Sequence, residues 1–469
     1  MNAQAPRRRK LVVAAAGTGT ALGFLDQTII GVALPTIGAD LGLSATERSW
    51  VVEAYLIPLA ALAVVAGSIG ARVGVRRLFT AGVLVFVAGS LACGLAAGAD
   101  WLIAGRAVQG TGAAAMFTAG QAMVVSAFPK ARRGRAIGGF LAVTTIALST
   151  GPLVGGALVD LVGWRAVFFV NPVLALATLP YILGWARNPE GDARAAHPPR
   201  FDASGFLLLV PILLLGTWAV TEAGRTGWSA ATIAAVGVAA LAVPVLIRIE
   251  SRRRDPMLDV ELLRQPVAGS AIVVVAAVGF VQLWGAISFP AFLQHDLGFS
   301  AFAAGAGLLP LTLALTGGQL IAGRIADLRG AALPGLVGTA GAGAALVATA
   351  LLVPALSYAP LVPVFVVAGI SLALAQTPMD AAAMSSVGAE RRTNVSGLLT
   401  TARQSSALFG LAFLGSLGAL LTQDDVTGGG GTGAAESGAA LQLGCVGAAV
   451  VLFAAALRIY VVLVRRGEG

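Results

Sequence analysis

Apolar segments of about 20 residues follow one another along almost the whole chain of 469 residues. A helix rises 1.5 Å per residue, so a segment of that length crosses a hydrocarbon layer roughly 30 Å thick. Only 11% of the residues are charged, against roughly 25% in soluble domains, and these cannot cover a water-facing surface. The sequence therefore predicts an all-α integral membrane protein.

Charged and Gly/Pro-rich stretches divide the sequence into 14 predicted membrane spans. We place them near residues 11–35, 49–70, 78–98, 101–125, 136–159, 165–186, 204–221, 229–248, 266–291, 301–322, 331–354, 358–382, 394–421 and 438–463. The first is expected to be a retained span, because no clear signal-peptide cleavage site follows it.

An internal repeat indicates how these spans are organised. Residues 67–74 follow the second predicted span, and residues 323–330, with glycines at the same two ends, follow the tenth. Repeats of this kind are typical of secondary transporters. We expect an N-terminal six-helix bundle over residues 1–186, a linker with two additional membrane helices over 187–264, and a C-terminal six-helix bundle over 265–469.

The distribution of basic residues predicts orientation and argues against a nucleic-acid partner. The net charge is +9, but the basic residues are spread over short loops instead of gathered on one soluble face. By our count, about 27 of the 31 lysines and arginines lie at the termini or beside loops after even-numbered spans. Positive loops stay inside, so both termini are expected in the cytoplasm of a multi-pass plasma or inner membrane protein. The preference for Arg over Lys is typical of a GC-rich bacterial genome.

Four polar residues inside the predicted spans are candidates for proton coupling and a substrate cavity. Asp26 lies roughly 22 Å along the first span, where desolvation disfavours a charged carboxylate, as a proton carrier requires. Glu53 and Arg106 lie at similar depths and would meet if their helices face each other, and Gln109 follows Arg106 by one turn. A structural hydrogen bond for Asp26, and side chains of Glu53 and Arg106 that reach interfacial water, are the alternatives.

Glycines and loop charges form two further groups of candidates. Gly151, Pro152, Gly155 and Gly156 lie in the fifth span and suit a hinge or sliding interface, or ordinary tight packing. Cytoplasmic gating contacts are predicted at the two repeat segments, the alternative being positive-inside topology alone. The gating residues are Gly67, Arg72, Gly74 and Arg76 in the first segment and Gly323, Arg324, Asp327 and Gly330 in the second.

These segments together resemble the major facilitator superfamily, and within it the drug:proton antiporter branch with 14 spans. The similarity lies in residues 25–35, 50–55, 67–77, 106–112 and 151–156, and it runs over nearly the whole chain. It implies a major facilitator fold of two six-helix bundles plus two linking helices. The 106–112 segment is similar to the motif associated with proton transfer, and 151–156 to the antiporter motif, which favours export. Ala71 stands where the loop motif normally has an acid, and Thr118 where the fourth-helix motif usually has proline.

The predicted function is proton-coupled export of drugs, antibiotics or related organic small molecules by alternating access, with antibiotic resistance as a consequence. An acidic cavity suits cationic substrates. The proton gradient would supply the energy, and no cofactor, metal or second subunit is expected, so the working unit is a monomer in the lipid bilayer. An intramembrane enzyme is disfavoured because the chain has only two histidines. A proton-coupled metabolite uptake symporter and a non-transporting membrane sensor are the alternatives.

Overall fold

The computed structural model describes residues 4–186, 203–253, 260–423 and 433–465. Throughout these ranges the secondary structure is helical, and no strand occurs in them. Parts of the predicted linker, residues 187–202 and 254–259, lie outside the described residues. The prediction of an all-helical protein is confirmed.

The chain divides into two compact units, residues 1–202 with 384–401 and residues 203–383 with 402–469. The predicted boundaries at 186 and 264 are not tested by this division and stay a prediction. The helices of the first unit are α1 (Gln4–Asp40), α2 (Ala45–Val73), α3 (Val75–Gly94), α4 (Ala99–Ala127), α5 (Arg133–Leu161) and α6 (Ala166–Ala186), with a 3-10 turn at Lys130–Arg132.

The second unit holds most of the remaining helices. They are α7 (Ala203–Thr226), α8 (Ala230–Glu250), α9 (Val260–Arg264), α10 (Pro266–His295), α11 (Ala301–Gly307), α12 (Leu309–Arg329), α13 (Ala332–Leu352), α14 (Leu361–Ser385) and α16 (Gly433–Ile459), with short helical turns at Val353–Ala355 and Tyr460–Val464. A further 3-10 turn, Ala389–Arg391, belongs to the first unit. Helix α15 (Arg392–Gln423) begins in the first unit and continues in the second.

Nine helices within the described ranges are long and apolar enough to cross a membrane. The other predicted spans coincide with α4, α6, α7, α12 and α15, so the number of 14 spans stays a prediction. The tenth predicted span is broken at Leu308 into α11 and α12. Pro310 explains the break, because proline lacks an N–H and is accommodated in the first turn of a helix.

The two repeat segments fold alike at the ends of α2 and α12. Gly74 and Gly330 end these helices with φ of 94° and 77°, and their N–H groups donate to Gly70 O at 2.9 Å and Ala326 O at 3.2 Å. Positive φ strains residues that carry a Cβ, so glycine is the residue that this turn requires. The sequence repeat is thus a repeat of helix-ending geometry.

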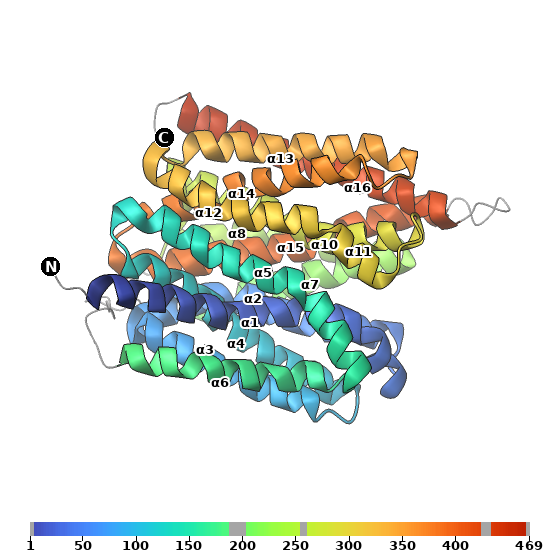
Figure 1. Ribbon diagram of the computed structural model, residues 1–469, viewed down its shortest axis with the longest axis horizontal. Helices are drawn as coiled ribbons and strands as arrows, with labels where there is room; N and C mark the ends of the chain where they lie inside the picture. Colours follow the sequence, from blue (N-terminus) through green and yellow to red (C-terminus); the bar gives the residue numbers. More distant parts are fainter. Residues whose placement is uncertain (1–3, 187–202, 254–259, 424–432, 466–469) are drawn as a thin grey trace. The chain divides into compact units, whose positions relative to one another are not determined.

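Helix α1 is the centre of the first unit. It contacts α4, α5 and α6, and Figure 1 shows it alongside α5. Its buried side chains Leu25, Ile29 and Ile30 pack in one apolar cluster with Leu102 of α4 and Phe168 of α6. Any polar group on this face of α1 is consequently buried between helices.

Candidate functional site

Asp26 lies on the buried face of α1, between Leu25 and Ile29, and is 1% exposed. Its Oδ2 atom accepts a hydrogen bond from Arg106 Nη1 of α4 at 2.5 Å, and this contact is also an ion pair. An isolated carboxylate in such a place would be strongly destabilising, whereas a paired and hydrogen-bonded one is accommodated. The ion pair therefore joins α1 to α4 inside the first unit.

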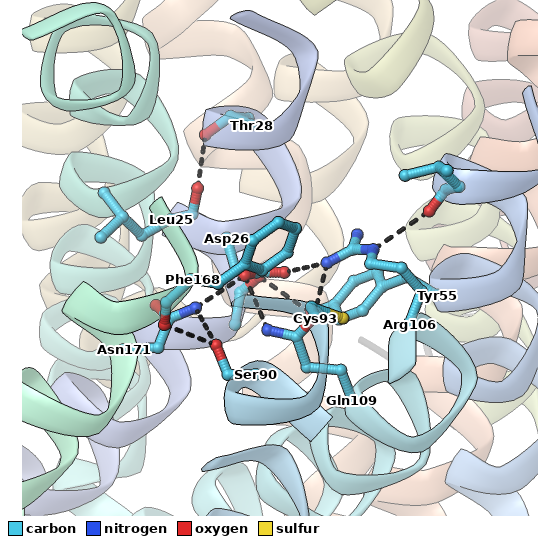
Figure 2. A network of polar contacts seen from close by, with 12 residues as sticks. Leu25, Asp26, Thr28, Tyr55, Ser90, Cys93, Arg106, Gln109, Phe168 and Asn171 are labelled. Carbon is cyan, nitrogen blue, oxygen red and sulfur yellow. Dashed lines mark hydrogen bonds and ion pairs between the residues drawn. The ribbon is translucent and has the colours of Figure 1, made fainter. Parts of the chain in front are cut away.

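Two amides complete the surroundings of the carboxylate (Figure 2). Gln109 Nε2 donates to Asp26 Oδ1 at 2.8 Å, and Asn171 Nδ2 of α6 donates to the same oxygen at 2.7 Å. Gln109 also accepts from Arg106 Nη1 at 2.8 Å through its Oε1 atom. With three donors on two oxygens, Asp26 joins α1, α4 and α6 at a single point. We call Asp26, Arg106, Gln109 and Asn171 the first polar junction.

A second layer of contacts holds the donors of this junction in place. Arg106 Nε donates to Val51 O of α2 at 3.0 Å, and the guanidinium lies 4.4 Å from the centre of the Tyr55 ring. The Tyr55 hydroxyl donates to Gly23 O of α1 at 2.9 Å. Asn171 Nδ2 also donates to Ser90 Oγ at 3.0 Å. The position of Arg106 is thus determined by α2 as well as α1.

Glu53 was expected as the alternative partner of Arg106. It lies half-buried on α2, two residues beyond Val51, whose carbonyl oxygen accepts a hydrogen bond from Arg106 Nε. A role for Glu53 in coupling stays a prediction.

The predicted antiporter helix contacts α1 beside Asp26. A Cβ built on Gly151 of α5 would overlap Thr28 Oγ1 and come within 3.2 Å of Leu25 O, and one on Gly155 would lie 2.9 Å from Ile29 Cγ1. Thr28 Oγ1 donates across the interface to Leu148 O at 3.0 Å. The glycines at 151 and 155 thus let α5 approach the stretch of α1 that carries Asp26.

Pro152 and Gly156 do not share that close contact. Pro152 is exposed on the other side of α5, and a Cβ on Gly156 would meet only Val32 Cγ1, at 4.0 Å. Of the four residues predicted from the sequence, Gly151 and Gly155 therefore pack closely against α1, whereas Pro152 and Gly156 do not. Its role in transport is not tested.

The gating residues lie at the ends of α2 and α12. In the first unit, Gly67 is buried, and a Cβ there would come 2.8 Å from Thr393 O. The side chains of Arg72 and Arg76 are half-buried. At the end of α12, Gly323 is buried, Arg324 exposed and Asp327 half-buried. The two sequence departures are also buried: Ala71 is 3% exposed, and the Thr118 hydroxyl donates to Ala63 O at 3.0 Å.

The sequence analysis did not identify every residue of the first polar junction. Asn171 was not among the predicted candidates, and neither were Ser90 and Tyr55, which contact the junction. An amide inside an apolar span is itself a signal, because a polar side chain there needs a partner. Applied to the sixth predicted span, this signal would have selected Asn171.

The comparisons with known proteins decide the family. Residues 16–411 match the sequence profile of the Major Facilitator Superfamily. The chain belongs to this family. It is therefore a multi-span membrane transporter and not an enzyme.

Named relatives are bacterial resistance proteins. The chain is 34% identical to the "Multidrug resistance protein Stp" of Mycobacterium tuberculosis over 88% of its own length and 76% of that protein. It is 30% identical to the "Methylenomycin A resistance protein" of Streptomyces coelicolor, over 86% and 84% of the two chains. It is 32% identical to the "Tetracenomycin C resistance and export protein" of Streptomyces glaucescens, over 86% and 74%.

The fold of the family is also found among solved structures. The crystal structure of the human organic anion transporter MFSD10 superposes with a TM-score of 0.67, over 96% of this chain and 99% of that one, at 12% sequence identity. At this identity the similarity concerns the fold alone. The predicted major facilitator fold is confirmed.

Proposed function

We propose that this transporter exports drugs, antibiotics or related organic small molecules in exchange for protons, by alternating access. The first polar junction is the observation that carries the proposal. It places a carboxylate, a guanidinium and two amides in the buried interior of one unit, where the cost of polar groups is highest. The names of the relatives, which include an export protein, support the direction of transport.

Protonation of Asp26 is the proposed coupling step. A neutral carboxyl accepts weaker hydrogen bonds from Arg106 and Gln109 than a carboxylate does, and it no longer neutralises the guanidinium. Proton uptake thus loosens the link between α1, α4 and α6, and proton release restores it. The conformational change is coupled to the proton if the two states of the transporter bind it with different affinity.

Helix α5 is the proposed route from the junction to the rest of the unit. Gly151 and Gly155 contact α1 within one turn of Asp26, so a displacement of α1 changes this interface directly. The loop residues at the ends of α2 and α12 are the proposed gating contacts. Their two glycine-ended turns supply rigid ends to the helices that would move.

Several finer properties belong to the same proposal. The chain spans the membrane 14 times with both termini in the cytoplasm, it acts as a monomer, and it uses the proton gradient without a cofactor. Cationic substrates are one proposed class, because Asp26 becomes available to a cation when it parts from Arg106. In the described geometry, three donors occupy that carboxylate.

Transport of ethidium into inside-out vesicles tests the proposal, with a proton gradient imposed or collapsed. We expect gradient-dependent accumulation by the wild type and its loss in Asp26→Asn. Glu53→Gln tests the other predicted coupling carboxylate, which is half-buried on α2. Gradient-driven transport that survives in Asp26→Asn would contradict the role of Asp26. Substrate movement in the same direction as the protons would instead identify a symporter. Absence of transport for every compound in a broad substrate panel would favour a sensor.

A further inference from the structure

A second buried acid–arginine pair lies in the second unit. Arg403 Nη2 of α15 is 2.7 Å from Asp380 Oδ2 of α14. The Asp380 side chain is 0% exposed and that of Arg403 is 12% exposed. Arg403 lies eleven residues beyond Arg392, the start of α15, and inside the predicted span 394–421. A pair at this depth is not explained by membrane topology.

Three helices converge at this pair. A Cβ on Gly279 of α10 would overlap Arg403 O and come 3.0 Å from Arg403 Cα, so α10 and α15 are in close backbone contact there. One turn along α10, Gln282 Nε2 donates to Gln376 Oε1 of α14 at 3.4 Å, and Gln376 is one turn before Asp380. We call Gln282, Gln376, Thr377, Asp380 and Arg403 the second polar junction.

The second polar junction is not the counterpart of the first. Gly410 of α15 lies against the backbone of Phe280 of α10, as Gly151 of α5 lies against Leu25 of α1. Both α1 and α10 carry a proline ten residues after that contact, Pro35 and Pro290. In this correspondence, the position of Asp26 is occupied by Val281. The second unit therefore repeats the packing of the first without its carboxylate, and it has its polar residues elsewhere.

Both junctions hold a buried arginine donor without a hydrogen-bond partner among the described residues, Arg106 Nη2 in the first and Arg403 Nε in the second. In the first, the carboxylate accepts from three donors. In the second, Arg403 Nε and the hydroxyl of Thr377, which is 0% exposed, have no hydrogen-bond partner among the described residues. Thr377 is one turn before Asp380 on α14, so its hydroxyl lies on the side of the helix that carries the pair. The Thr377 hydroxyl and Arg403 Nε thus offer two buried donors to an acceptor from outside the junction.

Unused buried donors require acceptors, and a carbonyl, phenolate or carboxylate oxygen is the chemical group that fits them. Ligand sites in proteins typically combine apolar walls with a small number of such groups. Buried arginine is suited to anionic oxygens because its donors diverge in a fixed plane. Asp380 keeps one of those donors occupied and fixes the orientation of the guanidinium.

We propose that the second polar junction binds oxygen acceptors of the transported molecule, with Arg403 and Thr377 as donors and Asp380 as the residue that positions Arg403. The substrate class is organic molecules with an anionic oxygen, such as a carboxylate or a phenolate. This inference rests on the proposed export of organic molecules and identifies the chemistry of the substrate site.

Two xanthene dyes of opposite charge test the proposal. Binding of fluorescein, an anion, and of rhodamine 123, a cation, is measured by fluorescence anisotropy on the purified chain in lipid nanodiscs, without a proton gradient. The wild type is expected to bind fluorescein. The Asp380→Asn/Arg403→Gln variant removes both charges together, and we expect it to bind fluorescein about 10- to 100-fold more weakly. Rhodamine 123 affinity should stay within about twofold.

Substitutions at Thr377 supply a test that does not depend on the charged pair. Thr377→Val keeps the shape of the side chain and removes a hydroxyl that has no partner among the described residues, so the fold should tolerate it. We expect fluorescein affinity to fall about 3- to 10-fold, and Thr377→Ser to retain it.

Three results would overturn the proposal. In the first, the wild type does not bind fluorescein. In the second, the double variant and Thr377→Val both bind fluorescein as tightly as the wild type. In the third, the double variant keeps its thermal stability but loses affinity for both dyes alike. The last would assign the junction a structural role. Since binding is measured without a gradient, failure of gradient-driven export would contradict proton coupling and leave this result standing.

Discussion

Asp26 and Arg106 are the residues on which the proposed mechanism depends most, and their mutual dependence is measurable. Each is 1% exposed at its side chain, and each neutralises the other. The attraction between such charges matters because removal of one partner leaves the other charged in a medium of low polarity. The pair should therefore behave as a unit in stability as well as in transport.

We expect Asp26→Asn to lower the free energy of unfolding by about 3 to 5 kcal/mol, because it leaves Arg106 charged and buried. The double variant Asp26→Asn/Arg106→Gln should regain a large part of the lost free energy of unfolding. Its transport should still not respond to the proton gradient. Thermal unfolding of the three proteins in the same detergent gives the comparison. Additive losses in the double variant would show that the two charges do not interact.

The sequence predicted which buried polar residues belong to the site more successfully than it predicted which residues they contact. Asp26, Arg106 and Gln109 were selected because polar groups in apolar spans are costly, and all three meet in the structure. The partners across helices depend on the rotation of each helix about its axis, which a hydropathy pattern specifies only loosely. That is why Asn171 was not predicted as a partner of Asp26.

At the scale of the helices, the interface between α5 and α1 lies next to the first polar junction, because α5 packs against the stretch of α1 that carries Asp26. Gly151 has no space for a Cβ, whereas Gly156 on the same helix has a 4.0 Å clearance. The two glycines thus provide a matched pair of substitution sites within one motif.

Gly151→Ala should destabilise the protein by about 1 to 3 kcal/mol through overpacking against Thr28, and it should slow transport. Gly156→Ala should be neutral or stabilising by up to about 1 kcal/mol, because alanine favours helix over glycine. Unfolding temperatures and ethidium export of the two variants are compared with the wild type. Equal changes in unfolding temperature and export in the two variants would show that the close contact between Gly151 and α1 does not matter for stability or transport.

Element boundaries were predictable where the chain carries a local signal. Gly74 and Gly330 end helices at the two repeat segments, as glycines with positive φ do. The interruption at Leu308 was not predicted, although Pro310 was visible, because prolines inside α1 and α10 do not interrupt those helices. Whether a proline ends a helix depends on the packing around it.

At the scale of the whole molecule, the number of membrane spans and the side on which each loop lies are testable predictions. Helices α7 and α8 contact each other and are the two additional spans of the proposal. If both cross the membrane, the chain between them lies on the opposite side from the chain that follows α8.

Cysteine labelling tests this directly. The two native cysteines, Cys93 and Cys445, are 0% exposed, so they should not react with a membrane-impermeant maleimide. In intact cells, we expect labelling of Ala230→Cys, at the start of α8, and none of Ser251→Cys, after α8, until the cells are opened. The same labelling of both positions in intact cells would show that α8 does not span the membrane.

The central claim is that Asp26 carries the proton exchanged for substrate, and substrate-induced proton release measures it most directly. Ethidium is added to the purified transporter in weakly buffered detergent solution, and the pH change is recorded for the wild type and Asp26→Asn. The account predicts about one proton released per ethidium bound by the wild type and none by the variant. Equal proton release from both proteins, with equal ethidium binding, would contradict it.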